Sequence, residues 1–176
     1  DNAYGQLIAP ALPPGLSYVD VDAGAVHSIA LRSDGQIVAW GNDFNGQLDV
    51  PALPAGLSYV GIAAGRIHNL ALRNDGTTAA WGDNSAAQCN VPVLPAGVSY
   101  AQLAPGGAHV VALRSDGTAV GWGNETYGQS EVPAPAPGLA YVEVSSGFVH
   151  SLARQNDGSL VAWGDDDDGQ CQVPPL

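Results

Sequence analysis

The feature that most constrains this chain is a repeat with a period of 41 residues, which runs without insertions. The recurring histidines are His27, His68, His109 and His150, and the recurring tryptophans are Trp40, Trp81, Trp122 and Trp163. Glycines, tyrosines and Asp-Gly pairs recur at the same step. A fixed period of about 20 to 50 residues is typical of stacked arrays. The chain must therefore build its core between repeated units.

Each repeat begins with a segment that predicts a β-strand. Residues 18–23 alternate between two kinds of side chain, which is typical of a strand with one buried face. The alternation assigns Val19, Val21 and Ala23 to that buried face. It assigns Tyr18 and the two intervening aspartates to the opposite face.

The middle of each repeat predicts a β-hairpin. Two β-rich runs, residues 27–32 and 36–40, flank an Asp34-Gly35 pair, and Asp-Gly tolerates the positive φ that tight hairpin turns require. The tail, residues 46–54, contains too much proline for a central strand, so we expect a crossing segment or a short edge strand. One repeat is therefore three strands and a return segment.

A sheet this small cannot cover both of its faces, so neighbouring repeats must stack face to face. Radial stacking produces a β-propeller. A linear solenoid is the alternative, but parallel β-helix coils are usually shorter and lack repeated Asp-Gly hairpins. We expect an all-β propeller or propeller segment of four 41-residue repeats. These span residues 15–55, 56–96, 97–137 and 138–176, after a partial repeat at 1–14.

The repeated string resembles one known family. It reads Gly-x-x-His-(Ser/Asn/Val)-(Ile/Leu/Val)-Ala-Leu-Arg-x-Asp-Gly-x-x-x-(Ala/Gly)-Trp-Gly, with Gly-Gln a few residues later. It resembles the RCC1 repeat and covers essentially all of residues 15–176. The Gly-Gln-x-x-Val-Pro ending looks most like the bacterial members, among them secreted β-lactamase inhibitors of the BLIP-II type. The second repeat departs from the pattern, with Ala87-Gln88 in place of Gly-Gln.

The resemblance implies a seven-bladed propeller that acts through protein contacts. Known roles in the family include nucleotide exchange on a small GTPase, chromatin docking and enzyme inhibition. Four repeats are fewer than seven, and residues 1–14 match residues 42–55, the return segment of a repeat. Three arrangements remain open: a window from a longer array, two chains forming an eight-bladed ring, and a filament joined through open ends.

The charge balance narrows the choice of partner. Seventeen acidic residues stand against five basic ones, all arginine, for a net charge of −12. Such a surface repels phosphate backbones and anionic lipid, so we expect no nucleic acid partner. No apolar run approaches the roughly 20 residues of a membrane-spanning helix, so we expect no membrane insertion. The acidic, lysine-free composition resembles exported bacterial proteins, and the expected location is extracellular or the cell surface.

No residues suggest catalysis, a metal or a cofactor. Equivalent positions on successive blades lie too far apart to share one metal ion, so we expect the histidines to bond to backbone or to a neighbouring strand. We expect the tryptophans to pack between blades, each indole N–H finding one acceptor. The run Asp165 to Asp168 lacks the alternation of a calcium loop. No nucleophile, base and orienting group recur at a motif spacing, so the chain is predicted not to be an enzyme.

The two cysteines, Cys89 and Cys171, occupy the same repeat position two repeats apart. In a propeller, positions two blades apart cannot meet the Cα separation of about 4.4 to 6.8 Å that a disulfide needs. We therefore expect no bridge within the chain. Free thiols, and a bridge to a second chain, both remain open.

Positions that vary while the surrounding pattern repeats are free of packing constraints and are the best candidates for recognition. Aromatic residues and arginine dominate interface energetics, which singles out Phe44, Arg66, Tyr127 and Phe148. Arg154 replaces the strand leucine of the other repeats, so we expect the fourth repeat to border solvent, a chain end or another subunit. The predicted function is a non-catalytic, exported protein-interaction module. The alternatives are a structural protein that self-associates through its chain ends and a secreted enzyme inhibitor.

Overall fold

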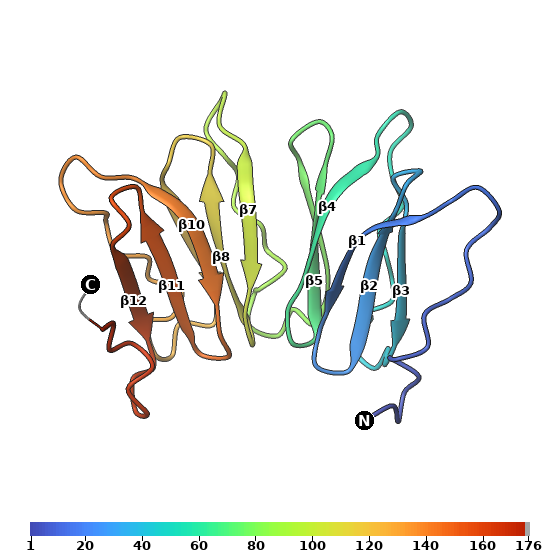
Figure 1. The fold of residues 1–176 in the computed structure, drawn as a ribbon, viewed down its shortest axis with the longest axis horizontal. Coiled ribbons are helices and arrows are strands. Elements are labelled where there is room, and N and C mark those ends of the chain that lie inside the picture. Colours follow the sequence, from blue (N-terminus) through green and yellow to red (C-terminus); the bar gives the residue numbers. More distant parts are fainter. Residues whose placement is uncertain (175–176) are drawn as a thin grey trace.

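The computed structural model describes residues 1–174 and is all-β, with no helix in that range. Twelve strands form four antiparallel sheets of three strands, paired in chain order. We call these sheets blades 1 to 4 (Figure 1). Their strands are β1 (Tyr18–Ala23), β2 (His27–Arg32), β3 (Ile37–Gly41), β4 (Tyr59–Ala64), β5 (His68–Arg73), β6 (Thr78–Gly82), β7 (Tyr100–Pro105), β8 (His109–Arg114), β9 (Ala119–Gly123), β10 (Tyr141–Ser146), β11 (His150–Gln155) and β12 (Leu160–Gly164).

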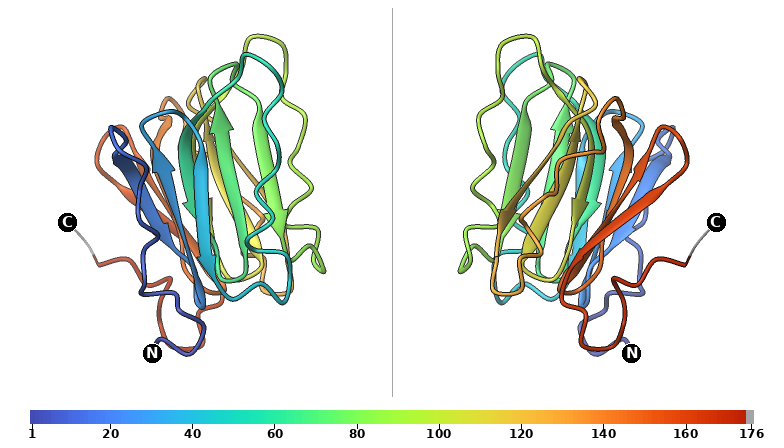
Figure 2. Two further views of the ribbon diagram at one scale, coloured as in Figure 1. Left: turned by 90° about the vertical axis from the view of Figure 1, so that its right-hand side faces the viewer. Right: turned by 90° about the vertical axis from the view of Figure 1, so that its left-hand side faces the viewer.

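The blades stand side by side in an arc, with blades 1 and 4 at its two ends (Figures 1 and 2). The first strand of each blade contacts the first strand of the next, so β1, β4, β7 and β10 form the inner edge. The return segments, such as residues 42–58, contain no strand and carry the chain from the outer strand to the next inner one. This is the arrangement of a propeller segment, as the repeat predicts.

The core consists of three apolar seams, one between each pair of neighbouring blades. In the first seam, Ile29 and Leu31 of blade 1 pack against Tyr59 and Trp81 of blade 2. The other two seams use the same positions of later blades. Apolar burial is the main favourable term in folding, so each blade depends on its neighbours for stability.

The first strand of each blade does not follow the strict alternation expected from the sequence. The register between β1 and β2 shifts between Tyr18 and Asp20, and β4, β7 and β10 repeat this irregularity. An extra residue in one strand reverses the side-chain phase beyond it. Val19 is therefore exposed, and in the later blades the tyrosine lies on the core face, where Tyr141 is only 2% exposed. Assigning Val19 to the buried face and Tyr18 to the opposite face was wrong.

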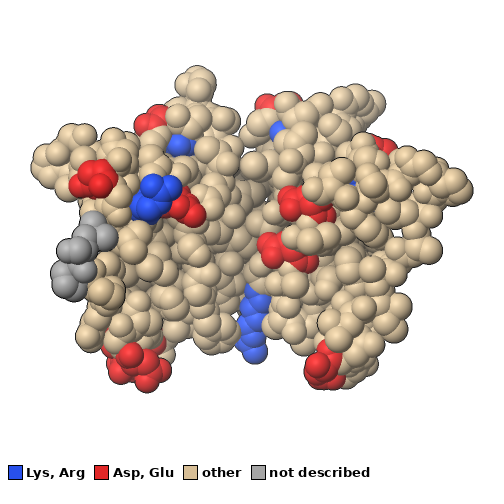
Figure 3. All heavy atoms as spheres, viewed as in Figure 1, with Lys and Arg blue, Asp and Glu red and all other residues tan. Residues whose placement is uncertain are grey.

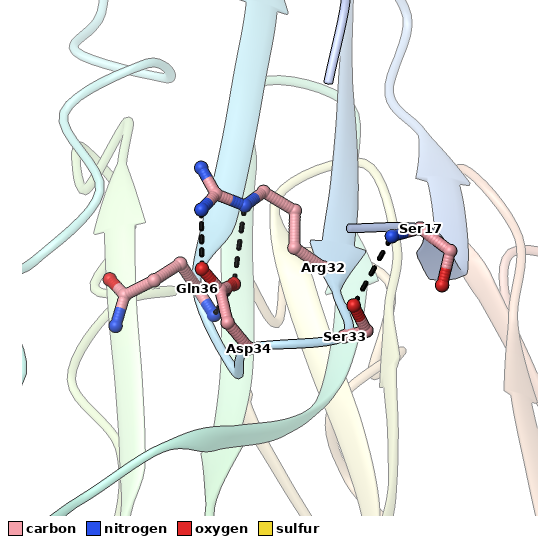
Figure 4. Close-up of polar contacts among 5 residues, drawn as sticks. All are labelled: Ser17, Arg32, Ser33, Asp34 and Gln36. Atoms are coloured by element: carbon pink, nitrogen blue, oxygen red, sulfur yellow. Dashed lines mark hydrogen bonds and ion pairs between the residues drawn. The ribbon is translucent and has the colours of Figure 1, made fainter. Parts of the chain in front are cut away.

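The two ends of each blade differ. At one end, which we call the hairpin end, the Asp-Gly turns join the second and third strands. Asp34 accepts hydrogen bonds from Arg32 and from the Gln36 backbone N–H, while Ser33 Oγ accepts from the Ser17 N–H at 3.2 Å (Figure 4). The bond from Arg32 is the main cause that lowers the pKa of Asp34 below its usual value. The polar side chains at the hairpin end thus form their hydrogen bonds within their own blade.

Ala87 occupies the turn position that glycine fills in the other repeats. Its φ is +63°, in the left-handed region, as at the equivalent Gly46 (+73°) and Gly128 (+72°). A Cβ in this region crowds the backbone at a cost of roughly 1–2 kcal/mol, part of which the extra flexibility of an unfolded glycine offsets. The second repeat therefore contains a strained turn.

We expect Ala87→Gly to raise the free energy of unfolding by about 0.5–1 kcal/mol, because it relieves this strain. Urea denaturation followed by circular dichroism measures the change. Gly46→Ala is the matched control in the first repeat and should lower stability by a similar amount. A loss of stability in Ala87→Gly would show that the methyl group makes contacts that outweigh the strain.

Candidate functional site

The end of the blades opposite the hairpins carries the four residues predicted for recognition, and we call it the loop end. Pairing of His27 with Gly41 brings two loops of blade 1 together there: residues 24–26, and residues 42–47 after β3. The Asn42 N–H donates to the Val26 carbonyl at 2.9 Å and ties them to each other. The loops of blades 2 to 4 repeat this arrangement, and in Figure 1 they lie along the lower edge.

The loops between the first and second strands form a continuous rim across all four blades. The Ala25 N–H donates to the Arg66 carbonyl at 2.9 Å, the Arg66 N–H to the Gly106 carbonyl, and the Gly107 N–H to the Phe148 carbonyl, the last two at 3.1 Å. The rim borders a shallow, open hollow of about 270 Å³, lined mainly by glycine, alanine and proline. Main-chain bonds between blades thus hold this surface in a fixed shape.

Arg66 and Phe148 meet on this rim although they lie two blades apart. The Arg66 guanidinium carbon is 5.2 Å from the centroid of the Phe148 ring, within range of a cation–π interaction. Between them lies Gly107 of blade 3, at the equivalent position. A Cβ there would stand 2.3 Å from the Phe148 carbonyl oxygen and 2.9 Å from its ring. The contact therefore requires the glycine.

Phe44 and Tyr127 lie in the loops that follow the third strands of blades 1 and 3. Phe44 is 85% exposed, and its ring meets Tyr4 edge to face at a centroid distance of 6.0 Å. Tyr127 is 52% exposed. Tyr4 escaped the sequence analysis because it lies in the partial repeat, where its counterpart in the first full repeat is Asn45. The available signal was that Tyr4 occupies the same repeat position as Tyr127, three periods earlier.

The histidines line the seams just behind the rim. His27 Nε2 lies 2.7 Å from Asn69 Oδ1 of the next blade, and His109 Nε2 lies 2.9 Å from Ser151 Oγ. Val110 occupies the corresponding position beside His68, and both ring nitrogens of His68 are buried with no partner within residues 1–174. Burial, aided by repulsion from His109, lowers the pKa of His68 to about 4. Burial likewise lowers the pKa of His109 to about 4.

The tryptophans join each blade to the preceding return segment. Trp81, Trp122 and Trp163 each donate the indole N–H to the main-chain oxygen of a glutamine in that segment, at 2.9 to 3.0 Å. Trp40 donates to the Gln6 carbonyl at 2.8 Å, so the N-terminal partial repeat lies on blade 1 as the other return segments lie on blades 2 to 4. Trp40 is half-buried, whereas the other three are buried.

The cysteines and the aspartate run take part in local turns. Cys89 and Cys171 each donate the thiol to a nearby main-chain oxygen, at 3.3 and 3.2 Å, and both are free. Burial raises the pKa of Cys89 to about 11, so its thiol stays protonated near neutral pH. Asp165 and Asp166 accept hydrogen bonds within their own turn. Residues 1–174 contain no cluster of three ligand-type side chains that could hold a metal ion.

Charged groups are scattered over the surface. The arginines appear as separate points among small acidic groups (Figure 3). Arg154 is exposed on the free face of blade 4, where it pairs with Glu143 at 2.9 Å. Within residues 1–174 no further blade covers that face. No helix in the described part of the chain is long and apolar enough to cross a membrane.

The four blades, their repeated seams and their loop end define this chain as a segment of a β-propeller. The model of the Regulator of chromosome condensation (RCC1) repeat matches residues 18–47, 101–129 and 141–170, half of the chain. The chain belongs to the RCC1 repeat family. The second repeat, which contains Ala87, lies outside the matched residues. No curated protein sequence matches the chain significantly.

Solved structures show the same fold. Prp20p of Saccharomyces cerevisiae matches with a TM-score of 0.82 at 22% identity, over 96% of this chain and 50% of that one. Human WBSCR16 matches with a TM-score of 0.74 at 20% identity, over 88% and 50%. The ectodomain of the Physcomitrella patens receptor kinase CR4 matches at 0.67 and 26% identity, over 86% and 42%. The chain thus spans about half the length of these relatives.

Proposed function

We propose that the chain is a non-catalytic protein-interaction module that binds its partner through the loop end. One observation carries the proposal: Phe44, Arg66, Tyr127 and Phe148 all lie at this end, on loops that the repeated scaffold holds in place. Exposed aromatic residues and arginine are the residue types that contribute most to binding energy at protein interfaces. Prp20p, whose fold is similar, is described with binding to Gsp1p and to histones.

The acidic composition supports a location outside the cell, and a partner whose surface is neutral or basic around the contact. A net charge of −12 raises the association rate of a basic partner and lowers that of an acidic one. The expectation that nucleic acid does not bind rests on the same charge.

Self-association through the end blades is a second candidate, favoured by a specific match of polar groups. Ser151 Oγ accepts from His109 while donating to the Gln129 carbonyl at 2.9 Å. Ser28 on blade 1 occupies the equivalent position, and its Oγ donates to the Gln6 carbonyl at 3.0 Å. The His150 imidazole of a second copy could meet Ser28 as His109 meets Ser151. Val21 and Leu160 are exposed on the two end faces and would be covered by such a contact.

The experiment immobilises the chain and captures proteins from an extract and from the culture medium of the source cells. Phe44→Ser and Phe148→Ser alter the loop end, and Val93→Ser, at an exposed valine near the hairpin end, is the matched control. We expect the wild type and the control to capture the same protein. The amount captured by at least one loop-end variant should be lower by at least about tenfold.

Capture that is equal in all variants, or no specific capture, would contradict binding through the loop end. Sedimentation of the same proteins over a range of concentrations detects assembly, which His150→Ala should weaken if the end faces join. Inhibition of a β-lactamase, measured with the same variants, tests the inhibitor alternative directly.

A further inference from the structure

Arg66 is a cation without an acidic partner in a strongly acidic chain. Arg32 pairs with Asp34 and Arg154 with Glu143. Arg73 and Arg114 also have no ion pair within residues 1–174, but both are partly buried. Within residues 1–174, Arg66 has no carboxylate within ion-pair distance, and it is exposed beside the hollow of the rim. Its interaction within the chain is with the ring of Phe148. The guanidinium of Arg66 therefore contacts Phe148 and remains accessible to a ligand.

The local architecture fixes the backbone of Arg66, and the contact with Phe148 favours one position of its side chain. Its backbone is bonded on both sides, donating to blade 3 and accepting from blade 1. The side chain reaches across Gly107 to blade 4, where the Phe148 ring supports the guanidinium. A group that is ordered before binding loses less conformational entropy when a ligand arrives, which increases affinity.

The chemistry of the hollow favours a carboxylate beside an apolar side chain. A guanidinium offers a planar set of N–H donors that matches the two oxygens of a carboxylate. The lining of the hollow contains no acidic residue, and the nearby Asp22 uses its Oδ2 to accept from the Ala64 N–H at 2.8 Å. Phe148 is 60% exposed and offers an apolar surface next to the charge. The hollow is shallow and open, and its volume of about 270 Å³ has room for one or two side chains of a segment that lies across it.

We propose that Arg66 and Phe148 form a recognition site for a peptide segment of the partner that presents a single carboxylate beside an apolar side chain. An Asp or Glu carboxylate bonds to the Arg66 guanidinium, and a neighbouring apolar side chain packs on Phe148. The net charge of −12 disfavours a run of acidic residues, so the segment carries one carboxylate among neutral or basic residues. This inference rests on the proposed function, because it names the ligand chemistry of one part of the loop end.

The experiment selects peptides from a phage-displayed library of random heptapeptides on the immobilised full chain. We expect enriched peptides with one Asp or Glu next to an apolar residue. Synthetic copies should lose affinity at least about tenfold for Arg66→Gln, because the variant cannot form the paired, charge-assisted bonds. Replacing the peptide's Glu with Gln should cause a similar loss. Phe148→Leu, which removes the aromatic face, should weaken binding severalfold.

Arg154→Gln is the matched control, since it removes an exposed arginine from the face of blade 4, and it should leave affinity within about twofold. Circular dichroism of each variant confirms that the fold is retained. Selected peptides that lack an acid, or that bind Arg66→Gln as well as wild type, would overturn the inference while leaving the loop end as a protein-binding surface. Tighter binding of a phosphoserine peptide than of its glutamate counterpart would overturn the assignment to a carboxylate.

Absence of any selected peptide would overturn the inference too, because the site is exposed and needs no further component to bind. The capture experiment then decides separately whether the loop end binds proteins: a captured protein that depends on Phe44 keeps the proposed function while the carboxylate site fails. If neither peptides nor proteins depend on the loop end, both proposals fail together.

Discussion

Replacing Trp81 with alanine should lower the free energy of unfolding by about 3–5 kcal/mol, the usual cost of removing a large buried aromatic side chain. Trp81 is only 6% exposed, packs in the seam between blades 1 and 2, and donates to the Gln47 carbonyl at 2.9 Å. The substitution leaves a cavity between two blades and removes one of the two donors to the Gln47 carbonyl oxygen, the other being the Asn69 side chain at 3.0 Å. Denaturation in urea, followed by circular dichroism, measures the loss.

Trp40 provides the matched control for this prediction. It makes the same hydrogen bond, to the Gln6 carbonyl, but it lies on the face of blade 1 that only the N-terminal segment covers. Because less apolar surface is buried there, Trp40→Ala should cost less than about 2 kcal/mol. Equal losses at the two positions would show that blade-to-blade packing is not what makes these tryptophans stabilising.

Acidification from pH 7 to pH 5 should lower the free energy of unfolding by about 2 kcal/mol for each of His68 and His109. An imidazole in the unfolded chain binds its proton below about pH 6.5. In the folded chain, burial lowers the pKa of both histidines to about 4. The unfolded state therefore binds more protons between these values, and stability falls as pH falls through that window.

The double variant His68→Gln, His109→Gln tests this prediction, because glutamine does not titrate. Its stability should change much less between pH 7 and pH 5 than that of the wild type. The hairpin aspartates do not affect this comparison. Hydrogen bonds lower the pKa values of residues such as Asp75 and Asp116, so their contribution to the free energy of unfolding falls only below about pH 4. An unchanged pH dependence in the double variant would contradict the role of the two histidines.

The contact between His68 and Val110 is a feature that the repeat pattern does not predict. Every repeat has the histidine, and the pattern predicts a bond to backbone or to a neighbouring strand for all of them. The structure provides a partner for His27 and for His109, but places Val110 beside His68. The residue after each histidine varies in the sequence, but only the seam shows that it faces the histidine of the preceding blade.

The 41-residue repeat was sufficient to predict the all-β class, the three strands per unit, the Asp-Gly turns and the stacking of units. These features follow from local hydrogen bonding and from the need to cover apolar faces. It also singled out Phe44, Arg66, Tyr127 and Phe148 as variable loop positions. Two features became visible only in the folded chain: the strand irregularity that places Tyr59, Tyr100 and Tyr141 in the core, and the contact between Arg66 and Phe148. Both depend on geometry that a linear pattern does not contain: one extra residue in a strand pairing, and the angle between blades that lets two side chains meet across Gly107.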